Sequence, residues 1–283
     1  MFGLLCIIHK TTINMKAIIL AGGAGTRLHP MTKAYSKQLL PIYDKPMVYY
    51  PISIAMLARI RDIAIITTPK DQELFKDLLG DGSQFGVRFT YLVQPEPKGI
   101  AQAFLIAEEF INNDSVMLIL GDNIFYGAGL TGLIRNAIAN SEYTAQIFGI
   151  PVKDPARFGV AFMHNNQLVK IVEKPKIFLS NLAVVGLYIY PADVVLRAKT
   201  LKPSSRGELE ITSLNNLYIN DNLCHLNHFG RGITWLDTGT PDSLLQAANF
   251  VHSIQDTMGI KIADLNEIAI ANEWITPPYT YLK

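Results

Sequence analysis

The stretch Met15-Lys-Ala-Ile-Ile-Leu-Ala-Gly-Gly-Ala-Gly-Thr-Arg-Leu28 contains a short apolar strand, residues 16–20, that runs directly into three glycines. A buried strand followed by a glycine-rich turn is typical of α/β proteins, in which backbone amides of the turn approach an anionic ligand. Arg27 stands inside the turn, where a guanidinium suits a polyphosphate. The spacing is not that of a P-loop, because no Gly-Lys-Ser/Thr follows. It is not that of a dinucleotide-binding turn either, because Arg27 and Leu28 stand where that pattern needs glycine. The stretch indicates an α/β fold with an anion site, and a tight turn without a ligand is the alternative.

Apolar runs alternate with amphipathic stretches along the rest of the chain, which is the pattern of βα units. In the first half we expect strands at 63–67, 88–93, 116–120 and 144–150, and helices at 47–61, 71–79, 99–111 and 130–139. In the second half we expect a hairpin of 160–163 with 168–173, strands at 183–190 and 233–236, and helices at 192–199, 208–218 and 241–254. The pattern predicts one α/β unit with a mostly parallel sheet and an antiparallel insertion in its second half.

Composition excludes several classes of protein. The 283 residues carry 25 Lys and Arg against 24 Asp and Glu, so a basic face for nucleic acid is disfavoured. Two cysteines, Cys6 and Cys224, are too few for a disulfide scaffold or a four-cysteine zinc site. No uncharged apolar run reaches the ~18 residues of a membrane span, and the first ten residues do not form a signal peptide. We expect a cytoplasmic protein whose residues 1–14 are an extension outside the fold.

Two aspartates directly follow predicted strands. Asp122 comes after 116–120 and Asp237 after 233–236, and the ends of such strands form the usual ligand edge of an open α/β sheet. Each alone is equally typical of a turn or a helix cap. Lys37 lies a dozen residues beyond the glycines and could reach the same anion or remain a solvated loop lysine. Cys224 has His225 beside it, but neighbours on a strand point to opposite faces, so a catalytic cysteine is disfavoured.

A series of motifs carries a family resemblance. They are GGAGTRLHP (22–30), KQLLPIYDKP (37–46), QPEPKGIAQA (94–103), GDNIFYG (121–127), EKPK (173–176), RGELEIT (206–212) and WLDTGT (235–240). In this order the chain resembles the sugar-1-phosphate nucleotidyltransferases from Met15 to past Phe250, and within them the enzymes that act on dTTP and glucose 1-phosphate to begin dTDP-sugar synthesis, such as that of dTDP-rhamnose. The resemblance implies a Rossmann-like, mostly parallel sheet flanked by helices, with an antiparallel sugar-binding insertion. It implies one domain over 15–283, with a nucleotide-binding half at about 15–150, a sugar-binding half at about 151–240 and C-terminal helices at about 241–283.

The resemblance also implies roles for individual residues. Catalytic roles fall to Arg27, Lys37, Asp122, Lys174 and Asp237. The nucleotide site comprises Leu20, Gly22, Gly23, Gly25, Thr26, Arg27, Gln94, Gly99 and Asp122. The sugar-phosphate site comprises Asn123, Gly159, Glu173, Lys174, Val184, Gly186, Tyr188 and Arg206.

In that assignment Asp122 and Asp237 converge on one Mg²⁺, a cation that suits oxygen ligands and substrate phosphates. Arg27 and Lys37 hold the triphosphate, and Gln94 reads the pyrimidine edge. Lys174 and Arg206 neutralise the sugar phosphate. The family further implies a homotetramer, with a regulatory nucleotide site at a subunit interface. Lys174 alone is also ordinary surface charge, and Tyr188 alone is also an ordinary core aromatic.

Three positions depart from the family pattern. Val185 stands where a threonine is usual, Phe162 where a carboxylate is common, and Ser213 where an aspartate is usual. If Val185 faced the sugar, hexose selectivity would change. Two alternatives therefore stay open: the same transfer with UTP or another hexose 1-phosphate, and a catalytically silent nucleotide-sugar sensor. A nicotinamide dehydrogenase is disfavoured by the glycine spacing.

Overall fold

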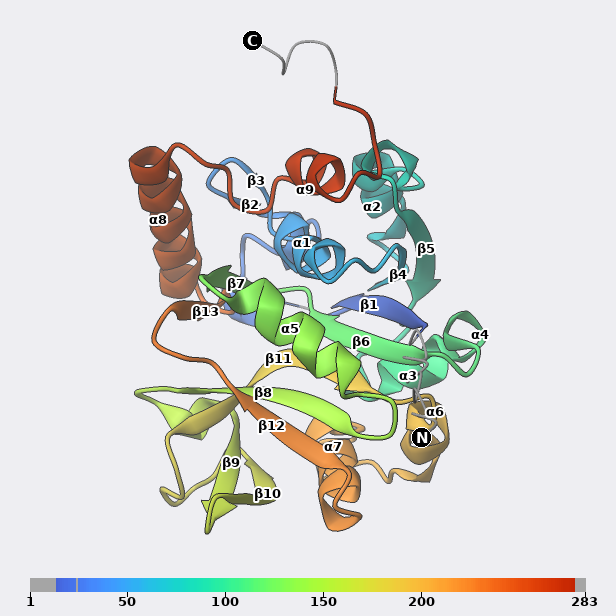
Figure 1. The fold of residues 1–283 in the computed structure, drawn as a ribbon, viewed down its shortest axis with the longest axis vertical. Coiled ribbons are helices and arrows are strands. Elements are labelled where there is room, and N and C mark those ends of the chain that lie inside the picture. The colour runs from blue at the N-terminus through green and yellow to red at the C-terminus, as the bar shows by residue number, and fades with distance from the viewer. Residues whose placement is uncertain (1–13, 24, 278–283) are drawn as a thin grey trace, which may run out of the picture.

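The structure, a computed structural model, describes residues 14–23 and 25–277. The expected N-terminal extension therefore lies outside the described residues, apart from Asn14. In the described part, helices lie on both faces of one large sheet of nine strands (Figure 1). This arrangement confirms the predicted fold class, a largely parallel sheet flanked by helices. No helix in residues 14–277 has both the length and the apolar character needed to cross a membrane.

Four parallel strands form the first half of the sheet, in the order β6-β1-β4-β5. They are β1 (Met15–Ala21), β4 (Asp62–Thr67), β5 (Arg88–Val93) and β6 (Ser115–Leu120). Each matches its predicted range to within one residue, because strands covered on both faces are almost continuously apolar. Leu20 of β1 pairs with Leu120 of β6, so the glycine-rich turn and the Gly121-Asp122 turn leave the sheet side by side.

The second half of the sheet is mostly antiparallel and contains five strands. They are β8 (Ala145–Pro151), β9 (Gly159–His164), β10 (Gln167–Glu173), β11 (Leu182–Tyr190) and β12 (Cys224–His228). β11 pairs antiparallel with β6, β8 and β9, and thereby joins this half to the parallel strands. The predicted hairpin is β9 with β10. β12 was not among the strands predicted by range, because its sequence Cys-His-Leu-Asn-His carries little apolar signal, although Cys224 and His225 were treated as strand neighbours. It runs parallel to β8 at the edge.

Two short ribbons lie outside the main sheet. One pairs β2 (Pro41–Ile42) with β3 (Lys45–Pro46), and the other pairs β7 (Asn123–Gly127) with β13 (Ile233–Asp237). β13 was predicted and β7 was not. In their antiparallel register, Asp237 lies opposite Asn123. This pairing joins two segments more than one hundred residues apart in the sequence, directly beside Asp122.

The helices follow the predicted pattern with shifted ends. They are α1 (Tyr49–Leu57), α2 (Gln72–Leu79), α3 (Gln102–Ile106), α4 (Glu108–Ile111), α5 (Leu130–Ala139), α6 (Val194–Thr200), α7 (Ile211–Asn220), α8 (Pro241–Met258) and α9 (Leu265–Ala271). The single helix predicted at 99–111 is two helices, because the chain leaves helical geometry at Ala107. α8 begins as expected with Pro241 in its first turn, and Thr240 Oγ1 caps it by accepting from the Ser243 amide at 3.3 Å.

Alternate residues of the strands supply two cores, one on each face of the sheet. Ile19 belongs to the core that also contains residues of α1, α2, α5 and α9, whereas its neighbour Ile18 belongs to the core that contains residues of α3, α4, α6 and α7. Val185 belongs to the first core and is fully buried. Val184 and Tyr188 belong to the second, so they face the other way from Val185. This alternation decides which residues of β11 can reach a ligand.

Candidate active site

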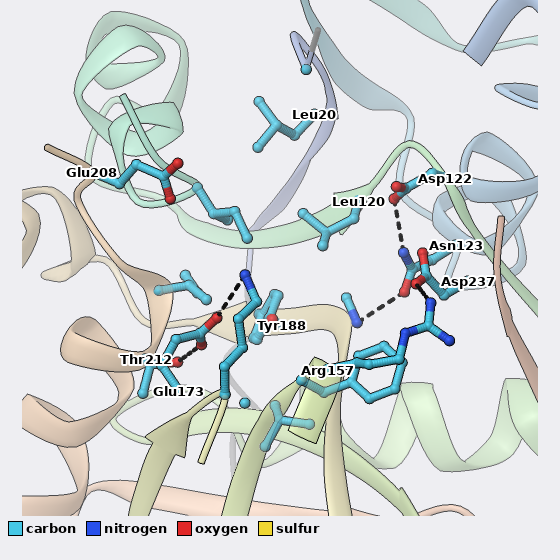
Figure 2. A pocket seen from close by; sticks show the side chains of 18 of the residues that line it. Leu20, Leu120, Asp122, Asn123, Arg157, Glu173, Tyr188, Glu208, Thr212 and Asp237 are labelled. Atoms are coloured by element: carbon cyan, nitrogen blue, oxygen red, sulfur yellow. Dashed lines mark hydrogen bonds and ion pairs between the residues drawn. The ribbon is translucent and has the colours of Figure 1, made fainter. Parts of the chain in front are cut away.

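A cavity of about 670 Å³ opens at the carboxyl ends of β1 and β6 and extends across β11 to β9, β10 and α7. Most of the predicted site residues line it: Leu20, Gly23, Thr26, Arg27, Lys37, Asp122, Asn123, Gly159, Glu173, Lys174, Val184, Gly186, Tyr188, Arg206 and Asp237. The remaining predicted residues, Gly22, Gly25, Gln94 and Gly99, lie outside the described lining. Figure 2 shows Asp122, Asn123 and Asp237 on one side of the cavity, Glu173 and Thr212 on the other, and Tyr188 between them.

The two aspartates converge because of the β7–β13 ribbon. Asp122 follows β6 and directly precedes β7, and Asp237 is the last residue of β13, opposite Asn123. Just beyond β13, the Thr238 amide donates to the Asp122 carbonyl at 3.1 Å, and the Thr238 hydroxyl donates to the same oxygen at 2.8 Å. Gly121 precedes Asp122 because a Cβ there would lie 2.8 Å from the Leu20 carbonyl oxygen. Local backbone contacts thus hold both carboxylates at the end of the parallel sheet.

The two carboxyl groups differ in their electrostatic surroundings. Burial works against ionisation of Asp122, but its ion pair with Lys37 outweighs burial and holds the pKa of Asp122 below its usual range. Burial, and then the negative charge of Asp122, raise the pKa of Asp237. Arg157 is the nearest cation to Asp237, at 3.5 Å, and its side chain is half exposed. The charge of Asp122 is therefore compensated by Lys37, whereas burial and the Asp122 charge disfavour the ionised form of Asp237.

This end of the cavity suits a divalent metal. Two carboxylates that repel one another offer oxygen ligands of the type that Mg²⁺ prefers. No group of three or more His, Cys, Asp or Glu side chains within residues 14–277 could hold a metal unaided. The other ligands of a magnesium ion here would be phosphate oxygens and water, as in other sites where Mg²⁺ accompanies a nucleotide. The Arg27 guanidinium lies at the same end, where a Cβ on Gly239 would approach it to 2.8 Å.

Asn123 connects three strands at the centre of the cavity. Its side-chain oxygen accepts from the Gly186 amide of β11 at 3.0 Å and from the Trp235 indole of β13 at 2.6 Å. Its side-chain nitrogen donates to the Asp122 carboxylate at 2.9 Å. A Cβ at Gly186 would lie 2.7 Å from the Asn123 oxygen, so this contact requires glycine. Asn123 was predicted to bind the sugar phosphate, and the structure adds that it orients Asp122.

The opposite end of the cavity contains one carboxylate, Glu173, and two half-exposed cations, Lys174 and Arg206. The Thr212 hydroxyl donates to Glu173 at 2.7 Å, which fixes that carboxylate at the start of α7. Lys174 lies 3.6 Å from Glu173, and Arg206 lies 3.7 Å from it, but Arg206 pairs more closely with Glu210 at 2.9 Å and with Glu208 at 3.3 Å. Gly159 lies beneath this group, where a Cβ would be 3.3 Å from the Glu173 carboxylate. The half-exposed Lys174 can meet an incoming phosphate directly, and Arg206 can do so by exchanging its contact with Glu210, while Glu173 can accept from hydroxyl groups.

The three departures from the family pattern lie away from the cavity lining. Val185 is fully buried in the core on the other face of β11, so its side chain does not face the cavity. Phe162 packs under the Lys170 ammonium, 5.9 Å from the ring centroid. Ser213 is exposed on α7. Tyr188 lines the cavity and also stacks on Tyr190, so it is both a lining residue and a core aromatic.

Several lining residues were not predicted, among them Arg157, Trp235 and Thr212. Arg157 had a usable signal, because it stands two residues before a predicted site glycine, Gly159. Trp235 had one as well, because it shares a face of its strand with Asp237. Thr212 had none beyond its place in the Arg206–Thr212 motif.

Comparison with known proteins gives consistent results. Residues 16–254 match the nucleotidyl transferase family. A glucose-1-phosphate thymidylyltransferase of Neisseria gonorrhoeae is 55% identical over 93% of this chain and 91% of that protein. Those of Xanthomonas campestris pv. campestris and Mycobacterium tuberculosis are 54% and 48% identical over 92% of this chain, and over 88% and 90% of those proteins.

Solved structures agree in fold. A Bacillus anthracis protein assigned as a glucose-1-phosphate thymidylyltransferase, crystallised with sucrose, superposes with a TM-score of 0.77 at 42% identity, covering 83% of this chain and 94% of that one. A UDP-glucose pyrophosphorylase bound to UDP-glucose has a TM-score of 0.75 at 24% identity, over 85% of this chain and 99% of that one, and supports the fold alone. The chain belongs to the nucleotidyl transferase family, and within it is similar over about nine-tenths of its length to glucose-1-phosphate thymidylyltransferases.

Proposed function

We propose that this chain transfers the thymidylyl group of dTTP to glucose 1-phosphate, giving dTDP-glucose and pyrophosphate. One observation carries the proposal: a single cavity places the paired carboxylates Asp122 and Asp237 at one end and the Glu173 cluster at the other. The first end has the charge pattern of a nucleotide and metal site, and the second has that of a sugar-phosphate site. Relatives at 48–55% identity are named for this reaction. The product would enter dTDP-sugar synthesis, such as that of dTDP-rhamnose.

The reaction needs positioning and charge stabilisation more than covalent chemistry by the protein. A phosphate oxygen of glucose 1-phosphate forms a bond to the α-phosphorus of dTTP, and the bond from that phosphorus to the bridging β-phosphate oxygen breaks. The pyrophosphate departs with this oxygen. Lys174 and Arg206 reduce the repulsion between the two anions as they meet, while Arg27 and Lys37 balance the charge on the leaving group.

We propose Asp122 and Asp237 as ligands of a magnesium ion, which would neutralise phosphate charge at the reacting centre. Asn123 holds Asp122 in place, and the ribbon of β7 and β13 sets the separation of the two aspartates. The Lys37 ammonium pairs with Asp122 in this structure, and it can exchange this partner for a phosphate oxygen when a nucleotide binds.

Product analysis tests the proposed function. Purified chain is incubated with Mg²⁺ and pairs of nucleoside triphosphate and sugar 1-phosphate, and products are identified by mass spectrometry. We expect dTDP-glucose from dTTP with glucose 1-phosphate, and its loss in Asp122→Asn but not in the exposed control Asp256→Asn. A preference for UTP or for another hexose 1-phosphate would correct the substrate. Binding without any product would favour a silent sensor.

We further propose that the chain forms a homotetramer with a regulatory nucleotide site where subunits meet. We also propose that it acts in the cytoplasm, where dTTP and glucose 1-phosphate are available. The charged fraction of 17% against a typical ~25% supports assembly, and so does the exposure of Phe178, Leu196 and Leu245. Light scattering should give four chains per particle, and dTTP should saturate at more than one site per chain. A monomer, or one site per chain, would contradict this part of the proposal.

A further inference from the structure

Gln94 lies directly behind the glycine-rich turn. It follows β5, is almost fully buried, and its backbone amide donates to the Thr67 carbonyl at 2.8 Å. Its side-chain oxygen packs against Gly22, where a Cβ would lie only 2.3 Å away. The carbonyl end of this amide therefore points toward Gly22; Gln94 itself lies just behind the cavity lining, to which the neighbouring Gly23 belongs. Glycine at position 22 is what leaves room for it.

A backbone N–H determines which way this amide points. The Lys98 amide donates to the side-chain oxygen of Gln102 at 3.1 Å, and a backbone N–H can only donate, so the Gln102 atom at that contact is its carbonyl oxygen. The same oxygen lies 2.8 Å from the side-chain nitrogen of Gln94. The Gln94 nitrogen also donates to the Gly99 carbonyl at 3.4 Å. Both of its hydrogens are thus directed to fixed acceptors.

The opposite orientation of Gln94 is unfavourable. Turning the amide over would bring the Gln94 oxygen against the oxygens of Gln102 and Gly99, so that acceptors would face acceptors. Two backbone bonds tie the surrounding loop to Leu209, so relieving this contact would disturb them: Leu209 donates to the Lys98 carbonyl at 2.7 Å, and Ala101 donates to the Leu209 carbonyl at 3.1 Å. Gly99 is packed so closely on Leu209 that a Cβ would lie 2.4 Å from its oxygen. The relay is rigid.

We infer that Gln102 is a positioning residue that makes Gln94 present an acceptor, and not a donor, to the nucleotide base. This inference rests on the proposed function and deepens it. Within the described residues, the Gln94 oxygen accepts no hydrogen bond, which leaves it for a ligand. A base with a hydrogen on N3, such as thymine or uracil, can donate to it. Cytosine carries a lone pair on N3, which would face the Gln94 oxygen and be rejected.

Two substitutions at position 102 separate this role from a purely structural one. Gln102→Leu keeps the size but removes the acceptor, which frees Gln94 to turn over. Gln102→Glu keeps a carboxylate oxygen that accepts from both Lys98 and Gln94, so it should restore the orientation. Gln167→Leu, at an exposed glutamine of β10 outside the lining of this cavity, is the matched control. Thermal melting verifies that each variant is folded.

The measurement is the preference for dTTP over dCTP, taken both as the ratio of dissociation constants by calorimetry and as the ratio of kcat/KM. We expect Gln102→Leu to lower the preference roughly tenfold, mainly through a higher KM for dTTP, with kcat little changed, whereas Gln102→Glu and the control keep it. An unchanged preference in folded Gln102→Leu, or an equal loss in Gln102→Glu, overturns the inference. A wild-type chain that binds dTTP no better than dCTP also overturns it. Selective binding of dTTP without turnover would contradict the proposed function but would still support the role of Gln102.

Discussion

Asp237, a proposed magnesium ligand, lies where its negative charge costs stability, and this cost can be measured. Burial and the Asp122 charge raise its pKa in the folded chain, despite three neighbouring cations. Because its folded pKa lies above its unfolded pKa, ionised Asp237 destabilises the metal-free fold at neutral pH. Asp237→Asn keeps the shape and removes the charge. We expect the variant to be more stable than the wild type without metal, and nearly inactive with it.

The size of the effect follows from the surroundings of the carboxylate. Each unit of pKa shift corresponds to ~1.4 kcal/mol. The half-exposed contact with Arg157 at 3.5 Å is lost in the variant but is worth little. We expect a net gain in stability and a Tm above that of the wild type, where each ~1 kcal/mol gained would appear as roughly 2–4 °C in a chain of this size. Removing one carboxylate ligand from the proposed magnesium site should lower kcat by at least ~100-fold.

The pH dependence distinguishes this explanation from a general stabilising effect. The stabilisation should be complete above the folded pKa of Asp237 and should vanish below its unfolded pKa, where the wild-type carboxyl is protonated too. Melting curves in EDTA between pH 3.5 and 8, with Asp256→Asn as an exposed control, measure it. A variant that melts below the wild type at pH 7.5, or a difference that does not change with pH, would refute the reasoning.

Three further substitutions test other parts of the site. Lys37→Met leaves the buried carboxylate of Asp122 unpaired, so the loss of Tm at pH 8 should correspond to ~3–5 kcal/mol and should be smaller in acid. Steady-state assays of the same variant should show kcat lowered ~10²–10³-fold. Thr212→Val removes the donor to Glu173, and KM for glucose 1-phosphate should rise ~2–10-fold while that for dTTP stays constant. Gly186→Ala forces a Cβ to within 2.6 Å of a leucine side chain, which should cost ~1–3 kcal/mol in urea unfolding. Gly132→Ala, in an open position of α5, should cost nothing.

The sequence was informative where neighbouring residues determine the structure. The four parallel strands were predicted to within one residue, because strands covered on both faces read as unbroken apolar runs. The placement of Asp122 and Asp237 after strands put each at a sheet edge, whereas the prediction that the two converge came from the family resemblance. Residue roles, by contrast, came from the family resemblance and not from the pattern itself.

Features that depend on distant segments were not predictable in this way. β7 has a short, mixed sequence, and it becomes a strand only because β13 pairs with it across more than one hundred residues. The orientation of Gln94 depends on a backbone donor at Lys98 and on its carbonyl partner, Gln102, at the start of α3. The question raised by Val185 needed the register of β11, because a shift of one residue would have turned it into the cavity.

The most direct test of the central claim is the release of pyrophosphate, followed continuously with a coupled assay. If one cavity brings the two substrates together for direct attack, release by the wild-type chain requires dTTP, glucose 1-phosphate and Mg²⁺ at once, and it stops on addition of EDTA. Asp122→Asn should abolish it while largely retaining dTTP binding. Equal release from dTTP without sugar phosphate would contradict direct transfer, and no release with any pair of substrates would contradict the proposed activity itself.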